Sequence, residues 1–313
     1  MGIYLVTGIA GFIGSQVALQ LIHNGHTVVG VDNLSTGYQY NVPREATFIE
    51  GNCQDEAVIE KLYQWKFDAM YHIAGQTSGE VSFDDPVYDL QTNTQSTLQL
   101  LNVCIQTGCR KFIYASSMSV YGNVAELSMP VKEKEVLPTP VSFYGIGKLA
   151  SEHYLRIFSS HYGISTAALR LFNVFGPGQN LSNMRQGMVS IFVAQCIKDK
   201  HIHVKGAAER YRDFIYIDDV VNAFIKTEDK MSEAELLLAN ICSGKKNTVV
   251  ELVNVIRRHV DYEVSTHFEG STPGDQFGIF GSNASAKALI GWAPQVGFEE
   301  GMRRMMDWAK NKL

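Results

Sequence analysis

Short apolar runs alternate with amphipathic stretches over the first 170 residues. In the stretch 12–24, Ile13, Val17 and Leu21 recur at every fourth position, which places them on one face of a helix. The apolar runs predict strands at 3–7, 27–31, 45–50, 67–73, 110–116 and 164–171. The amphipathic stretches predict helices at 12–24, 54–64, 86–107 and 143–162. Strand and helix in alternation indicate an α/β fold, with a parallel sheet covered by helices on both faces.

This alternation ends near residue 172. Beyond it, helices without regular partner strands are predicted at 187–199, 218–229, 248–260, 283–290 and from 298 onward. Longer loops are predicted at 173–186, 205–214 and 268–282. We therefore expect two parts, residues 1–172 and a smaller α/β lobe at 173–313, whose segments can interleave across an approximate boundary.

Composition and charge argue against several classes of protein. Lys and Arg number 27 against 32 Asp and Glu, a net charge of −5 without basic clusters, which disfavours nucleic acid and anionic membranes as partners. No apolar run approaches the roughly 18 residues that span a bilayer, and the N-terminus lacks the features of a signal peptide. The five cysteines form no CxxC pair. We expect no metal site or disulfide framework, and a cytoplasmic protein.

The first predicted strand runs into the sequence TGIAGFIG, in which Gly8, Gly11 and Gly14 separate a strand from a helix. A tight turn, close approach to a pyrophosphate and close helix packing each require a residue without a side chain. The helix N-terminus offers free N–H groups to the phosphates. Asp32 ends the second strand 18 residues after Gly14, where a carboxylate binds the adenosine ribose and repels a 2′-phosphate. The pattern predicts a Rossmann-type, doubly wound sheet that prefers NAD to NADP.

A second group of reactive residues follows the predicted strand at 110–116. Tyr144 and Lys148 are four residues apart at the start of a predicted helix and share one face. A free tyrosine has a pKa of about 10, and a neighbouring ammonium favours its phenolate. We therefore expect Lys148 to lower the pKa of Tyr144 and make it a proton acceptor. The strand ends in Ser116, Ser117, Met118 and Ser119, and a hydroxyl at the carboxyl end of a strand faces the ligand crevice in open α/β sheets.

Further motifs accompany these two sites: DNLSTG at 32–37, Asn93, ASSMSVYG at 115–122, LRLFNVFGPG at 169–178, RDFIYIDDVV at 212–221 and PGD at 273–275. Together they resemble the extended short-chain dehydrogenase/reductases, most strongly the nucleotide-sugar epimerases and dehydratases, over almost the whole chain. The resemblance implies an NAD-binding Rossmann domain at 1–172 and a nucleotide-sugar-binding lobe at 173–313. It also implies Ser117, Tyr144 and Lys148 as catalytic residues.

The resemblance extends to individual cofactor contacts. Lys148 would also hold the nicotinamide ribose, and Asn93 would help to place the cofactor. The full set of expected NAD-binding residues is Gly8, Gly11, Phe12, Ile13, Gly14, Asp32, Asn33, Ser35, Thr36, Gly37, Asn52, Cys53, Ala74, Asn93, Tyr144 and Lys148.

For a nucleotide-diphosphate sugar as substrate, the resemblance implies Ser117, Ser119, Asn173, Lys205, Arg212 and Asp275. Two positions depart from the related 4-epimerases. Lys205 replaces an aromatic residue that usually stacks on uracil, and Thr272 replaces an arginine that usually contacts the diphosphate. Arg185, Arg210 and Arg212 remain as cations for a diphosphate. The nucleotide therefore stays open among UDP, GDP, CDP and dTDP.

Met118 and Ser119 reduce the number of reactions that the site can catalyse. Related dehydratases and decarboxylases carry an acidic residue here, whereas neither side chain of this chain can donate a proton to a departing hydroxyl. We expect an epimerase that acts at C4 through a 4-keto intermediate. A 2-epimerase and a C4 dehydrogenase or reductase with the same residues stay open. A non-catalytic NAD or nucleotide sensor is disfavoured, because a sensor has no need of an acid–base set.

The helical stretches 86–107 and 143–162 carry apolar residues beyond a single stripe, among them Leu98 and Ile157. A helix packed only on one face of a sheet needs one apolar stripe. The excess, together with the resemblance, predicts a homodimer formed through a four-helix interface, with Leu98 facing outward. The alternative is that the C-terminal lobe of the same chain covers these residues.

Overall fold

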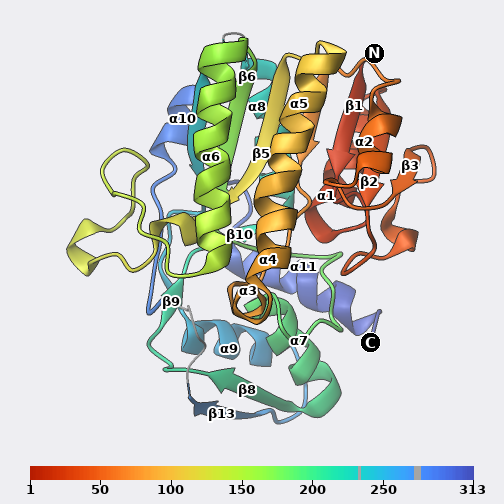
Figure 1. Ribbon diagram of the computed structural model, residues 1–313. Coiled ribbons are helices and arrows are strands. Elements are labelled where there is room, and N and C mark those ends of the chain that lie inside the picture. Colours follow the sequence, from red (N-terminus) through yellow and green to blue (C-terminus); the bar gives the residue numbers. More distant parts are fainter. Residues whose placement is uncertain (232–233, 271–275) are drawn as a thin grey trace.

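The structure is a computed structural model that describes residues 1–231, 234–270 and 276–313. Seven parallel strands form its main sheet in the order β11-β6-β5-β4-β1-β2-β3 (Figure 1). Their bounds are β1 Ile3–Thr7, β2 Thr27–Asp32, β3 Thr47–Glu50, β4 Ala69–His72, β5 Lys111–Ser117, β6 Ser165–Leu171 and β11 Leu236–Ile241. The sheet confirms the predicted fold class and the six strands expected before residue 172.

The direction in which successive strands are added reverses between β1 and β4. β2 and β3 extend the sheet on one side of β1, whereas β4, β5 and β6 extend it on the other. β1 and β4 pair up to Thr7 and His72, after which their chains separate. A crevice opens at such a point, at the carboxyl ends of the strands, and ligands bind there in open α/β sheets.

β11 was not expected from the sequence. It comes from the later part of the chain and still pairs with β6 along its whole length, from Leu236 opposite Thr166 to Ile241 opposite Leu171. The division at residue 172 stays a prediction for the two functional parts, but the sheet itself takes one strand from beyond it.

Helices cover both faces of the sheet (Figure 1). One layer contains α1 Phe12–His23, α8 Ile217–Lys230 and α10 Ala284–Ile290. The other contains α2 Glu56–Leu62, α5 Ser96–Thr107 and α6 Phe143–Tyr162. Each layer has its own buried apolar cluster, because the side chains of a strand alternate between the two faces. Leu5 packs under the α5 layer, whereas its neighbour Val6 packs under the α1 layer.

The remaining C-terminal elements lie beyond the carboxyl ends of the strands, in the lower half of Figure 1. They comprise α7 Met188–Asp199, α9 Val249–Arg258, α11 Phe298–Lys310 and the strand pairs β7 Asn173–Phe175 with β10 Phe214–Tyr216, β9 Tyr211–Arg212 with β12 Asn247–Thr248, and β8 His201–Lys205 with β13 Ser265–Glu269. The loops predicted at 173–186, 205–214 and 268–282 therefore contain parts of these short strands. Such strands pair only over two to five residues, too few for a pattern in sequence.

The stretch 86–107, predicted as one helix, has an irregular centre. α3 Gly79–Asp84 and α4 Pro86–Leu90 precede a π-helical turn at Gln91–Gln95, and α5 follows directly. A π-helical turn accommodates one extra residue and is frequent at functional sites. Here it contains Asn93, which is completely buried. Three 3₁₀ turns complete the description, at Gln39–Asn41, Met118–Tyr121 and Glu126–Ser128. Within the described ranges, no helix is long and apolar enough to cross a membrane.

A buried ion pair connects α6 to the sheet. Glu152 accepts hydrogen bonds from Arg170 of β6 at 2.9 Å and 2.7 Å, and one from the hydroxyl of Ser116 of β5 at 2.5 Å. Both charged side chains are almost fully buried, at 5% and 3% exposed. The guanidinium also lies 4.7 Å from the centre of the Tyr121 ring. Removal of either partner leaves a charge in the interior without compensation.

We expect Glu152→Leu to lower the free energy of unfolding by about 3–5 kcal/mol, the typical effect of breaking a buried pair. The double variant Glu152→Leu/Arg170→Met should lose less than the single variant, because no unpaired charge remains. Chemical denaturation followed by circular dichroism measures both. Glu135→Leu, which breaks an exposed pair with Lys132, is the control and should cost less than about 1 kcal/mol. A double variant whose loss of unfolding free energy equals the sum of the losses of Glu152→Leu and Arg170→Met would contradict this account.

Candidate active site

The first of three adjoining cavities lies where β1 and β4 separate. The turn after β1 begins at Gly8, whose φ of 73° is in the left-handed region that favours glycine. The Gly11 N–H donates to the Gly8 carbonyl at 3.0 Å, and a side chain at Gly14 would collide with the same carbonyl. α1 therefore starts tight against the turn. It has no side-chain cap at Gly11, so its first N–H groups remain available to an anion.

Asp32 forms one wall of this cavity. Its carboxylate accepts hydrogen bonds from the Ala10 N–H at 3.0 Å and the Leu34 N–H at 2.8 Å, and it is 8% exposed. Burial raises the pKa of this carboxyl, and the backbone N–H donors act in the opposite direction. Two backbone donors hold the group in one place, where its remaining lone pairs can accept from ribose hydroxyls.

All residues predicted to bind NAD line this cavity except Asn93, Tyr144 and Lys148. The residues that do line it are Gly8, Gly11, Phe12, Ile13, Gly14, Asp32, Asn33, Ser35, Thr36, Gly37, Asn52, Cys53 and Ala74. The glycine turn, the uncapped helix start and the carboxylate fit a dinucleotide with its pyrophosphate at α1. Their individual roles in binding stay predictions.

The second cavity, of about 260 Å³, contains the predicted catalytic residues Ser117, Tyr144 and Lys148. The Ser142 hydroxyl accepts from the Gly145 N–H at 3.1 Å and caps α6, which places Tyr144 in the first turn of the helix. Lys148 lies one turn further along and donates to the Ala115 carbonyl at 2.9 Å. Its Nζ is 5.7 Å from the centre of the Tyr144 ring. The structure thus brings the end of β5 and the start of α6 together around one space.

The expected effect of Lys148 on Tyr144 is not found in the protein by itself. Burial raises the pKa of Tyr144 to about 12, although a hydrogen bond with Ser117 lowers it in part. Burial also lowers the pKa of Lys148 to about 8, against the opposing effect of Asp89 and Glu152. The sequence argument considered the charge of the lysine and not the loss of water around the phenol, which is the larger effect here.

A third cavity adjoins the second and contains the cations of the C-terminal region. Arg185, Lys205 and Arg210 line it together with Ser119 and Asn173, which the catalytic cavity shares. The residues Thr77 and Gln186 line all three cavities. The cofactor, catalytic and cationic cavities therefore adjoin one another.

Two of the predicted substrate residues need comment. Arg212 is buried at 2% exposed, and its guanidinium donates to the Gln276 carbonyl at 2.8 Å and the Tyr211 carbonyl at 2.7 Å. It lines none of the three cavities described above. Asp275 lies outside the described residues, as does Thr272.

The sequence did not single out Thr77, Gln186 or the polar contacts beneath the cofactor cavity. Thr7 Oγ1 accepts from the Ile73 and Ala74 N–H groups at 3.1 Å each and lies 2.8 Å from His72 Nδ1, which joins the ends of β1 and β4. These contacts could have been inferred from the position of Thr7, which ends a strand directly before the first glycine of the turn. Thr77 and Gln186 lie in loops that carry no pattern, so no signal pointed to them.

The fold and these cavities are typical of an α/β enzyme that binds a dinucleotide at the carboxyl ends of its strands. A family model described as "NAD dependent epimerase/dehydratase family" matches residues 4–237. The chain is 31% identical over 314 residues to the UDP-glucose 4-epimerase of Mycolicibacterium smegmatis, with 98% of each chain covered.

Two solved structures are similar along the whole chain. The UDP-glucose 4-epimerase of Thermotoga maritima with UDP-glucose has a TM-score of 0.94 at 35% identity and covers 99% of both chains. The UDP-glucose 4-epimerase of Thermus thermophilus with NAD has a TM-score of 0.91 at 31% identity and covers 99% of this chain and 100% of that one. The chain belongs to the NAD-dependent epimerase/dehydratase family of extended short-chain dehydrogenase/reductases, and its cofactor is NAD.

We expect the protein to bind NAD at least about tenfold more tightly than NADP, because Asp32 faces the 2′ position with a negative charge. Asp32→Asn should reduce the preference for NAD over NADP. Calorimetry on cofactor-free protein measures it, and Glu50→Gln, on the neighbouring strand and outside the cavity, should leave it unchanged. Tighter binding of NADP by the wild-type protein would overturn the role of Asp32.

Tyr144→Phe should leave NAD binding and the fold intact and lower kcat by roughly two to four orders of magnitude, the usual contribution of a positioned acid–base group. Tyr162→Phe removes an exposed hydroxyl at the far end of the same helix and should retain wild-type kcat. Steady-state turnover with a nucleotide sugar is the measurement. A Tyr144→Phe variant with near-wild-type turnover would exclude Tyr144 as the base.

Proposed function

We propose that the protein is a cytoplasmic nucleotide-sugar 4-epimerase with a UDP-sugar as substrate. The observation that carries this proposal is that the catalytic cavity adjoins a cavity lined by Arg185, Lys205 and Arg210. A sugar beside Tyr144 then has its diphosphate near three cations, of which arginine matches phosphate oxygens best. The similarity to UDP-glucose 4-epimerases, one of them solved with UDP-glucose, supports UDP as the nucleotide.

In this mechanism the residues of the chain handle the proton. Tyr144 takes the proton of the sugar 4-hydroxyl and later returns it, Ser117 donates a hydrogen bond to the same oxygen, and Lys148 favours the phenolate by its charge. NAD in the cofactor cavity would supply the hydride chemistry at C4 of the sugar. Within the chain, Lys148 is the charge that favours the phenolate, against the burial that raises the pKa of Tyr144.

The surroundings of Ser117 favour epimerisation over dehydration. Ser119 lies 3.2 Å from it through the two hydroxyl oxygens, and Met118 lines the same cavity. Neither side chain has a pKa near neutrality, so neither can protonate a departing hydroxyl at C6. The reaction is therefore expected to stop at oxidation and reduction of the same carbon.

Incubation of the purified protein with UDP-, GDP-, CDP- and dTDP-sugars, followed by NMR of the products, tests this function. A 4-epimer formed without a net change in NADH absorbance supports it. Accumulated NADH or keto sugar would instead indicate a dehydrogenase. Epimerisation of a GDP- or CDP-sugar alone would reject UDP while retaining the reaction.

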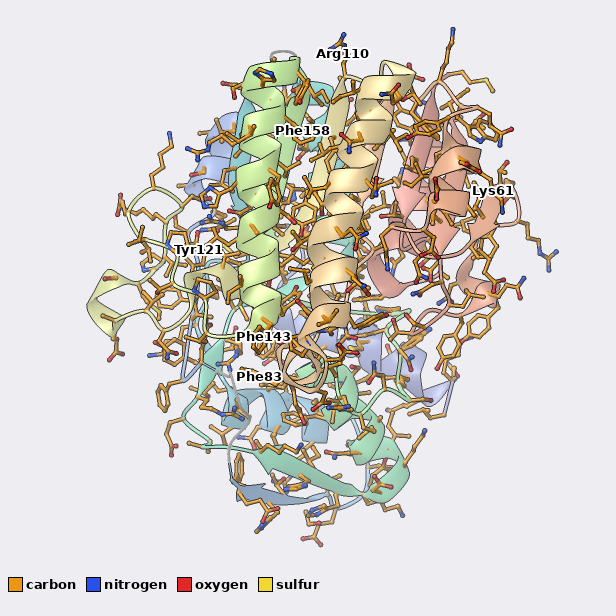
Figure 2. The ribbon with its side chains drawn as sticks, viewed as in Figure 1. Lys61, Phe83, Arg110, Tyr121, Phe143 and Phe158 are labelled. Atoms are coloured by element: carbon orange, nitrogen blue, oxygen red, sulfur yellow. The ribbon has the colours of Figure 1, made fainter. Side chains whose placement is uncertain are left out.

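We also propose that the protein is a homodimer through α5 and α6. The outward face of these helices, with α4, has large exposed apolar side chains: Leu90 at 58%, Ile146 and Ile157 at 53% and Tyr154 at 37% exposed. No other described element lies over this face in Figure 1, so the C-terminal lobe does not cover it. Figure 2 shows Phe83 and Phe143 close together at its lower end, with ring centres 5.5 Å apart.

The outward position expected of Leu98 stays a prediction. Leu98 is half-buried and packs in part against the apolar cluster under α5, and it precedes the exposed Asn102 and Ile105 by four and seven residues on the same helix. Ile157 is the better site for a disruptive charge.

Light scattering at micromolar concentration should give about twice the chain mass of 34.8 kDa for the wild-type protein. Ile157→Asp should give the monomer mass and still bind NAD, since the glycine turn lies on other elements. Leu289→Asp, which places the same charge at a 49% exposed leucine of α10, should remain dimeric. A wild-type mass of one chain would exclude the dimer.

A further inference from the structure

Asp89 is a buried carboxylate near the catalytic residues that the mechanism above does not use. It lies in α4, is 1% exposed, and its Oδ1 accepts hydrogen bonds from Gln76 Nε2 at 2.8 Å and Asn93 Nδ2 at 3.1 Å. Within the described part of the chain it forms no ion pair. Burial raises the pKa of this carboxyl, whereas its hydrogen bonds with Gln76 and Asn93 and the nearby Lys148 act in the opposite direction and favour the ionised form. In a medium of low polarity, the ionised carboxylate acts strongly on a nearby cation.

The packing of α6 brings the catalytic lysine toward this carboxylate. At Gly147, the residue before Lys148, a Cβ atom would lie 3.4 Å from Asp89 Oδ2 and 3.2 Å from Asn93 Cβ. The absence of a side chain at Gly147 therefore lets α6 pass close to α4 and the π-helical turn. Asp89 is consequently held against the helix that carries Lys148.

Asn93 is oriented by the same carboxylate. Its Nδ2 donates to Asp89 and to the Gln76 carbonyl at 2.9 Å, so its Oδ1 points the other way, where it is buried and has no hydrogen-bond partner among the described residues. A Cβ at Gly75 would collide with this Oδ1 and lie 3.3 Å from Lys148 Nζ. The amide oxygen of Asn93 and the ammonium of Lys148 thus both face the α-carbon of Gly75.

The charge balance around Lys148 leaves Asp89 as its main counter-charge. From β5, Tyr114 presents its ring 4.7 Å from Nζ, and from β4, His72 is neutral because burial lowers its pKa to about 3. On α6 itself, Tyr144 is a protonated phenol, and the negative charge of Glu152 is balanced by its ion pair with Arg170. Asp89 raises the pKa of Lys148 more than Glu152 does, against the larger effect of burial.

We propose that Asp89 is a positioning residue of the active site: its buried carboxylate keeps the Lys148 ammonium charged and, through the amide of Asn93, turns an acceptor oxygen toward that ammonium. This inference rests on the proposed function only in assigning Lys148 a catalytic role. Without Asp89, Lys148 becomes neutral within the physiological pH range, and the phenolate of Tyr144 loses the positive charge that favours it.

The first test measures thermal unfolding of the NAD-free protein between pH 7 and pH 9. Between about pH 8 and the usual lysine pKa of 10.5, the unfolded chain binds a proton that folded Lys148 does not, so stability falls as the pH is lowered. In Asp89→Asn this fall should continue below pH 8. Its Tm deficit relative to wild type should then be larger at pH 7 than at pH 9, by about 2 °C for each unit by which the lysine pKa drops.

Two variants distinguish this effect from lost packing. In a Lys148→Met background, Asp89→Asn should cost the same Tm at pH 7 and pH 9. Asp85→Asn removes an exposed carboxylate four residues earlier that caps α4, and its effect should not depend on pH in this range. Asp89→Ala should show the same pH-dependent decrease in Tm as Asp89→Asn. It should also lower Tm by a larger amount that is the same at every pH. A Tm deficit independent of pH, or one that persists unchanged without Lys148, would overturn the proposal.

The second test is the pH profile of kcat. In Asp89→Asn the alkaline limb of the profile should move to lower pH by about one unit, since the carboxylate raises the pKa of Lys148, while KM for the sugar changes less than twofold. A kcat lowered equally at every pH would indicate a purely structural role and reject the proposal. The unfolding series needs neither NAD nor a sugar, so its outcome stands even if the proposed substrate is wrong.

Discussion

The inner face of α6 carries charge into the interior of the protein, and the active site depends on how that charge is compensated. Tyr144, Lys148 and Glu152 follow one another at four-residue intervals on this face. Glu152 is balanced by Arg170 of β6 and by the hydroxyl of Ser116, which fastens the middle of the helix to two strands. The hydrogen bond that Lys148 donates among the described residues goes to a carbonyl. Removal from water is therefore the largest effect on the lysine and the tyrosine, and it shifts their pKa values toward the neutral forms against the partial opposition of Asp89, Glu152 and Ser117.

The same helix lines the catalytic cavity, which adjoins both the cofactor cavity and the cationic cavity. Its first turn faces the catalytic cavity, which shares Phe12, Ile13 and Ile73 with the cofactor cavity and Asn173 with the cationic one. The strands of the main sheet end beneath all three. β11 and α8 come from the later part of the chain and join the sheet layer, so the segments that line the cationic cavity are anchored to the same core as the cofactor cavity. Under the proposed function, a sugar in the cationic and catalytic cavities would keep a fixed position relative to a cofactor in the neighbouring cavity.

Most of the cofactor cavity could be predicted from local sequence. The glycine turn, Asp32 and the loop after it are contiguous or fall at the end of a strand, and residues close in sequence retain their geometry wherever the fold places them. Asn93, expected to help place the cofactor, lies in the π-helical turn behind Gly75 and does not itself line the cofactor cavity, so its role stays a prediction. The sequence predicts one continuous helix over 86–107 and does not reveal the π-helical turn at Gln91–Gln95.

The sequence by itself determined the α/β class, the dinucleotide turn and the pairing of Tyr144 with Lys148 on one helix face, since each rests on residue types at short, regular spacings. Tertiary structure alone decided the seventh strand, the proximity of the three cavities and the protonation of Tyr144 and Lys148. These depend on contacts between residues far apart in the chain and on the exclusion of water around them. Asp89 acts on Lys148 across 59 positions of sequence, and burial reverses the expected shift in the pKa of Tyr144. Spacing along a chain describes neither distance in space nor the polarity of the surroundings, and both set the energy of a charge.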